Sequence, residues 1–64
     1  MEFFDNTTYT NSKGETILVK TLTTETEVGY TYTDGAFCDV FDSNGQFKER
    51  GWFFIHAIEN FINR

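Results

Sequence analysis

Apolar or β-branched residues alternate with polar residues along much of the chain. The alternation has a period of two in residues 28–33, and the mostly apolar residues 36–41 follow them; both segments are typical of strands. Residues 15–24 are rich in Thr, Ile, Leu and Val, and residues 3–10 resemble them more weakly; these residue types suit a pleated surface. We therefore predict four antiparallel strands before residue 42, with residues 46–50 as a possible fifth.

Turn residues separate these segments. Small polar residues precede a glycine in residues 11–14, 34–35 and 42–45, and such pairs are typical of hairpin turns. The Asp34-Gly35 pair is the strongest of the three signals, because Asp-Gly suits a two-residue turn. We expect it to join residues 28–33 to residues 36–41.

The pattern changes to a helical period near the C-terminus. Apolar residues follow helical spacing at Phe54, Ile55, Ile58, Phe61 and Ile62. We predict an amphipathic helix over about residues 51–63. An earlier start is the alternative, since Ser43 and Gln46 have capping-box spacing, but it places Gly51 inside the helix at a cost of about 1 kcal/mol.

Together these elements predict one α+β domain over residues 1–64. It is an antiparallel β-meander of four to five strands, with one C-terminal amphipathic α-helix packed on one face. Strand order, and the face that the helix covers, stay open. A chain of 64 residues buries only about 60% of its unfolded surface, so its stability must be supplemented.

Neither a disulfide nor a structural zinc site can supply this additional stability. Cys38 and His56 are the only residues of their types, which excludes an internal disulfide and a structural zinc site. Aromatic residues make up 19% of the chain, and each buried ring removes about 150–250 Å² from water. Aromatic packing, and either self-association or a partner, are the expected sources of stability.

Adjacent apolar residues exceed what one helix can cover. Neighbouring residues of a strand point to opposite faces, so Phe3-Phe4, Ile17-Leu18-Val19 and Val40-Phe41 each send a side chain to the uncovered face. Such a patch is typical of an interaction surface, unless the sheet curls or loops cover it. Phe53 lies either on the polar side of the helix or buried at the corner between strand and helix.

The charge favours basic partners. Ten acidic and five basic residues give a net charge of −5, which opposes binding to nucleic acid and to anionic membranes. Met1 to Asn6 lacks a basic secretion-signal region, and no apolar run is long enough to span a membrane. We expect a cytoplasmic protein with a basic or nucleic-acid-binding protein partner. The candidate partner-binding residues are Glu25, Glu27, Asp34, Asp39, Asp42 and Phe53.

Catalytic, cofactor and metal sites are not predicted. Cys38, in the middle of a strand, is typical of a small buried hydrophobe, and Asp42-Ser43-Asn44-Gly45 is explained by turn chemistry. Glu25 and Glu27 have threonine neighbours that would not raise a pKa. Residues 50–55 partly match the aromatic RNA-binding strand of the RRM fold, but Phe53, the chain length and the charge depart from it. We expect a protein that is not an enzyme.

In general style, a short, acidic, aromatic-rich chain without proline resembles the accessory proteins that bacteriophages make to inhibit host enzymes or defence systems. The resemblance is one of composition and implies no residue or target. It suggests an inhibitor or adaptor that acts by protein contact, in the host cytoplasm if phage-encoded, with a nucleic-acid mimic as its sharper version. The alternative is a homo-oligomeric structural or accessory protein, such as a homodimer through the uncovered face.

Overall fold

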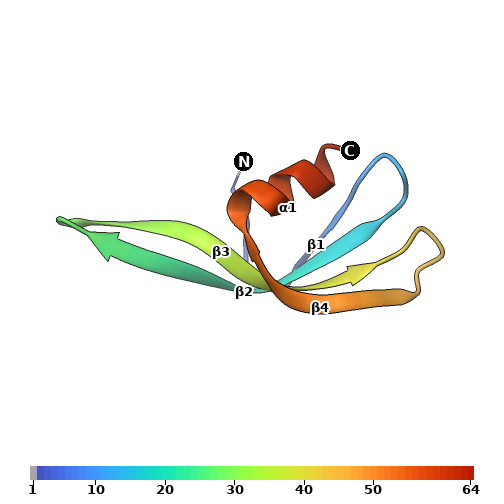
Figure 1. Ribbon diagram of the computed structural model, residues 1–64, viewed down its shortest axis with the longest axis horizontal. Helices are drawn as coiled ribbons and strands as arrows, with labels where there is room; N and C mark the ends of the chain where they lie inside the picture. The colour runs from blue at the N-terminus through green and yellow to red at the C-terminus, as the bar shows by residue number, and fades with distance from the viewer. Residues whose placement is uncertain (1) are drawn as a thin grey trace.

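A computed structural model describes residues 2–64, apart from the side chains of Glu25, Glu27 and Tyr32. It contains a sheet of four antiparallel strands followed by one helix (Figure 1). The elements are β1 (Thr7–Thr10), β2 (Thr16–Glu27), β3 (Tyr30–Phe41), β4 (Phe47–Phe54) and α1 (Ile55–Ile62). The predicted α+β meander with a C-terminal helix is therefore confirmed.

The strands lie in the sheet in their sequence order, β1-β2-β3-β4. Residues 47–50 do form a strand, which continues to Phe54. It is the fourth strand and not the fifth, because the predicted strands 28–33 and 36–41 form one strand, β3. The prediction that the helix begins near Gly51 is wrong, as is the alternative of a still earlier start. Trp52 pairs with Phe37 and Phe53 with Ala36, since aromatic side chains favour the pleated ladder.

The prediction of a hairpin turn at Asp34-Gly35 is also wrong. Both residues lie inside β3, and the chain reverses instead at Val28 and Gly29. These two residues have φ angles of 42° and 92°, and positive φ at both central positions is typical of a type I′ hairpin turn. Gly35 serves a different purpose, because the ring of Trp52 lies where its Cβ would be; glycine in a strand often marks such a close approach.

Strands β2 and β3 extend beyond their neighbours as a two-stranded ribbon. β1 pairs with β2 only over Thr16–Val19, and β4 pairs with β3 only from Gly35 onward. Residues 24–33, which we call the arm, therefore project from the body of the molecule (Figure 1), whose extents are 44 × 19 × 15 Å. An isolated two-stranded ribbon is only marginally stable in water.

The core lies between α1 and one face of the sheet. From the helix, Ile58 and Phe61 are buried against sheet residues, and Phe3 closes one side. The buried apolar residues of the sheet are Ile17, Val19, Ala36, Cys38 and Val40. They alternate along β2 and β3, so the helix covers one face and leaves the other without a helix. Residues 28–33, where the sequence has a period of two, lie instead in the arm, and Val28 and Tyr30 are exposed there.

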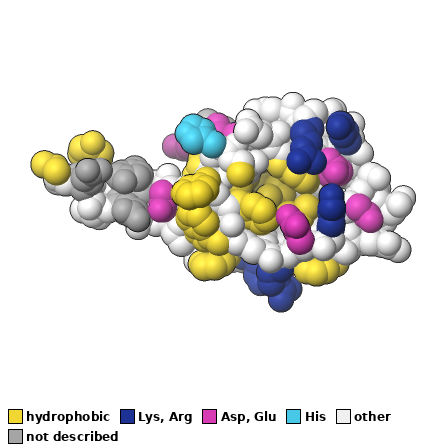
Figure 2. Space-filling view, in the orientation of Figure 1, with side chains coloured by type: hydrophobic (Ala, Val, Ile, Leu, Met, Phe, Trp, Pro, Cys, Tyr) yellow, Lys and Arg dark blue, Asp and Glu magenta, His cyan; other side chains and the backbone are white. Residues whose placement is uncertain are grey.

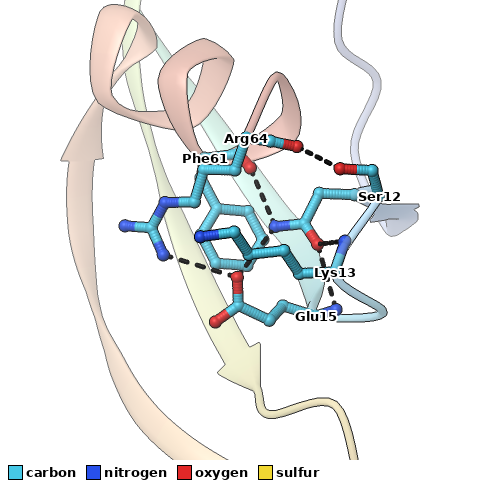
Figure 3. Close-up of polar contacts among 6 residues, drawn as sticks. Ser12, Lys13, Glu15, Phe61 and Arg64 are labelled. Carbon is cyan, nitrogen blue, oxygen red and sulfur yellow. Dashed lines mark hydrogen bonds and ion pairs between the residues drawn. The ribbon is translucent and has the colours of Figure 1, made fainter.

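The loop between β1 and β2 holds the end of the helix (Figure 3). Buried Asn11 donates from Nδ2 to the Phe61 carbonyl at 2.9 Å and to Glu15 Oε1 at 3.0 Å. Its Oδ1 accepts the backbone N–H groups of Lys13 and Glu15. This one side chain thus satisfies the turn and donates to a carbonyl of the last helical turn, which the Arg64 backbone N–H also reaches at 3.4 Å. The turn pattern alone did not reveal this role.

Replacing Val28 by asparagine is expected to raise the free energy of unfolding by about 1 kcal/mol. A β-branched residue is strained at positive φ, whereas asparagine adopts this region readily, and Val28 loses no packing because its side chain is 94% exposed. Urea unfolding measures the change. Val28→Thr keeps the β-branch and should give no comparable gain; equal stabilisation by both variants would contradict the strain.

Candidate protein-binding surface

The sheet face opposite α1, which we call the helix-free face, carries aromatic side chains. Ala36, Cys38 and Val40 point into the core, so the residues between and beside them, among them Phe37, point away from the helix. Phe37 pairs with Trp52 on the neighbouring strand. Of the residues predicted to reach the uncovered face, Leu18 does so, because it lies between the buried Ile17 and Val19. Phe3 and Phe4 lie outside the strands.

Three aromatic residues lie on this face where the arm meets the body. Trp52 and Phe54 meet edge to face with centroids 4.7 Å apart, and Phe37 lies directly across from Trp52. We call these three residues the aromatic cluster. Phe37 and Phe54 are 51% and 64% exposed, which leaves two large rings in water with no covering element from the described chain.

Gly35 and Thr23 hold the Trp52 side chain in place. A Cβ at Gly35 would lie 2.2 Å from Trp52 Cζ2, so the indole rests directly on the glycine backbone. The indole Nε1 donates to Thr23 Oγ1 at 3.2 Å, and that hydroxyl donates in turn to Asp34 Oδ1 at 3.0 Å. The ring is thereby fixed in one orientation, which lowers the entropy lost on binding.

A second aromatic pair lies at the other end of the same face. Phe41 and Phe47 meet edge to face at 6.0 Å, and the Arg50 guanidinium lies 5.7 Å from the centre of the Phe47 ring. Phe47 is 55% exposed. The helix-free face is therefore apolar at both ends.

Charged residues lie between the two apolar ends of the helix-free face. Asp39 accepts from Arg50 Nε at 2.7 Å and from Nη2 at 3.3 Å, and Lys20 Nζ lies 3.9 Å from it. These hydrogen bonds with Arg50 hold the pKa of Asp39 below its usual value. Asp39 is only 6% exposed, so its carboxylate already has partners within the chain.

Acid should weaken the fold through this carboxylate. The folded state lowers the pKa of Asp39. The ionised carboxylate therefore contributes its full stabilisation at pH values above its unfolded pKa of about 3.8. This contribution is lost as the pH falls through the lower pKa of the folded state. We expect Asp39→Asn to be less stable at neutral pH and to lose less stability on acidification. Urea unfolding at several pH values measures this; parallel pH profiles for the two proteins would contradict it.

Glu15 adds to the same acid dependence. The hydrogen bond from Asn11 is the main cause that lowers its pKa, and Arg64 contributes further. Glu15 remains in the Asp39→Asn variant, so that variant should retain part of the acid sensitivity. Glu15→Gln is the matched substitution that removes the second part.

The predicted partner-binding acids are distributed over separate parts of the chain. Asp39 lies in the middle of the helix-free face, and Asp34 is half-buried at the root of the arm. Asp42 accepts the N–H groups of Asn44 and Gln46 in the β3–β4 turn. Glu25 and Glu27 belong to β2 in the arm, and their side chains lie outside the described residues.

Phe53 takes the corner position that was one of its two predicted places. It belongs to β4 and is half-buried against the core on the helix side, so it does not join the aromatic cluster. A partner-binding role for Phe53 and for the five acids stays a prediction. The residues that sequence reasoning missed are Phe37, Trp52 and Phe54, and the period of two between Trp52 and Phe54 was the available signal.

Cys38 and His56 lie in unlike surroundings. Cys38 is fully buried and His56 is 97% exposed on α1. Burial raises the pKa of the Cys38 thiol to about 11, so the thiolate that a nucleophile requires is disfavoured at neutral pH. Among the side chains that the structure describes, no group of three His, Cys, Asp or Glu residues is placed to hold a metal ion.

Within residues 2–64, no helix has the length and apolar character needed to cross a membrane. No protein-family model matches the sequence, and neither curated proteins nor solved structures give a match.

Proposed function

We propose that this chain is a protein-binding module, an inhibitor or adaptor that acts by contact and without catalysis, and that it binds its partner through the helix-free face. The exposed aromatic cluster is the observation that carries the proposal. Tryptophan and other aromatic residues are enriched at protein interfaces, where anchors fill pockets on the partner.

The energetics favour an occupied face. Burying an exposed apolar side chain contributes about 25 cal/mol per Å² of area removed from water. Phe37, Phe54 and Phe47 are each more than half exposed, and Trp52 is held rigid between Gly35 and Thr23. A partner that covers this face gains this burial without having to order the indole.

Charge supports a basic partner. Residues 21–37 contain Glu25, Glu27 and Asp34 and no Lys or Arg, and this acidic segment leads directly into the aromatic cluster. A basic partner surface would be steered toward the arm and then dock on the rings, because complementary charge raises association rates more than affinity. A nucleic-acid-binding protein is one such partner, blocked at its basic cleft.

Two substitutions on the face test the proposal. Phe37→Thr and Phe54→Thr each remove an exposed ring and keep a residue that suits a strand. The tagged chain is used as bait in a lysate, and each recovered protein is then titrated against the variants. We expect each variant to weaken binding by about 1–3 kcal/mol, and weaker binding at high salt.

Phe4→Thr is the matched control, because Phe4 is 60% exposed but lies outside the strands. Equal loss with Phe4→Thr, or none with the face variants, contradicts the proposal. Capture that nuclease abolishes would instead indicate nucleic acid stacked on the rings. The homo-oligomeric alternative predicts that the wild-type chain associates through this same face and that Phe37→Thr lowers its solution mass.

A further inference from the structure

A recess lies on the helix side of the body. It has a volume of about 170 Å³ and lies between α1 and the sheet. Ile17, Val40, Phe53, Ile58 and Phe61 contribute apolar lining, and Ala57 lies beside them. We call this recess the helix-side pocket. It is separate from the aromatic cluster, which lies on the opposite face of the sheet.

Charged residues line the same pocket. Lys48, Glu49 and Arg64 complete its lining, so cations outnumber anions there. Arg64 is shared with Glu15 at 3.4 Å. Lys48 makes no ion pair among the side chains that the structure describes, although its charge also helps to lower the pKa of Glu15. In Figure 2, hydrophobic side chains on the body are surrounded by charged side chains of both signs.

The tip of the arm carries exposed apolar side chains and acidic residues, which complement the apolar and basic lining of the helix-side pocket. Val28 is 94% exposed and Tyr30 is 66% exposed, and residues 21–37 carry acids without Lys or Arg. Val28 also has a φ of 42°, which a β-branched residue adopts only under strain. Neither packing within the chain nor local backbone preference explains valine here, and strained residues of this kind cluster at functional sites.

We propose that the arm tip of one molecule docks in the helix-side pocket of a second copy of this chain. Val28 enters the apolar pocket, and the acidic arm approaches Lys48. The arm projects away from the body (Figure 1), so it reaches a pocket on another molecule rather than its own. The contact joins two different surfaces and is therefore heterologous, forming a closed assembly or a chain of copies.

Two variants disable opposite halves of this contact. Val28→Asn removes the apolar tip and suits the turn, so the fold is retained. Ala57→Glu places an acid in the pocket at an exposed helix position. Light scattering across a wide concentration range should show wild-type mass rising with concentration, and each variant alone should associate at least about tenfold more weakly, a loss of about 1.4 kcal/mol.

Mixing the two variants is the decisive step. The mixture contains one intact tip and one intact pocket, so it should regain association in a 1:1 complex that salt weakens. His56→Glu is the matched control, since it adds the same charge on α1 outside the pocket lining and should behave as wild type. A wild type that is monomeric throughout, association that both variants retain, or a mixture that fails to associate would overturn the proposal.

Discussion

Ile58→Ala is expected to lower the free energy of unfolding by about 2–5 kcal/mol, the range for truncating a large buried aliphatic side chain. Ile58 is completely buried and packs into the core from α1. A domain of 64 residues has a total stability of roughly 3–10 kcal/mol at about 0.05–0.15 kcal/mol per residue. The variant should therefore lose a large share of the total stability.

The physical reason lies in the size of the helix. α1 has only eight residues, too few to be stable in water without tertiary packing, and Ile58 and Phe61 are its buried side chains. Urea unfolding followed by circular dichroism measures the loss. His56→Ala, at an exposed position of the same helix, should change stability by less than about 0.5 kcal/mol; a similar small effect at Ile58 would contradict the described core.

Gly35→Ala should have the second largest effect, a destabilisation of about 3 kcal/mol, at the upper end of overpacking costs. The added Cβ would lie 2.2 Å from Trp52 Cζ2 and 2.7 Å from the Phe53 carbonyl oxygen. Rotation of the indole relieves only the first of these contacts. The backbones of β3 and β4 must therefore separate at their junction, and the aromatic cluster should lose its arrangement.

Trp52 is the only tryptophan, so its fluorescence reports this change directly alongside urea unfolding. Gly51→Ala is the matched control in the neighbouring strand, because a Cβ there meets only Phe53 ring atoms at 4.0 Å, an ordinary contact. That variant should be neutral or slightly stabilising, since alanine reduces the entropy of the unfolded chain. Equal effects at the two glycines would show that Trp52 does not rest on Gly35.

The strand pattern could be predicted from sequence because burial enforces it. Ile17 and Val19 on β2, and Ala36, Cys38 and Val40 on β3, alternate because every second side chain must enter the core. The turn could not be placed from composition, since Asp34-Gly35 is the better turn sequence but Val28-Gly29 forms the turn. Pairing along the whole length of β2 and β3 outweighs the local preference.

The start of the helix was predicted wrongly for a related reason. Phe54 and Ile55 fit a helical period with Ile58, yet Phe54 is extended and belongs to β4. Short apolar runs satisfy both periods, and pairing of Trp52 with Phe37 decides between them. The aromatic cluster was missed because of this error, since its members share a face only if Gly51 to Phe54 is a strand.

The two surfaces proposed here make separate demands on the chain. The aromatic cluster lies where β3 pairs with β4, and the arm tip lies at the turn between β2 and β3. Substitution of Phe54 should therefore leave self-association intact, and substitution of Val28 should leave Trp52 in place. Each surface can therefore be removed without the other. This separation allows partner binding and self-association to be assigned independently.

Fluorine NMR of the chain labelled with fluorotryptophan tests the central claim, that the helix-free face binds a protein partner, most directly. One tryptophan gives one resonance, and Trp52 lies at the centre of the proposed contact. On addition of the partner recovered with the wild-type bait, the resonance should shift or broaden, and Phe37→Thr should weaken that response. A partner that binds while the Trp52 resonance stays unchanged would contradict the account.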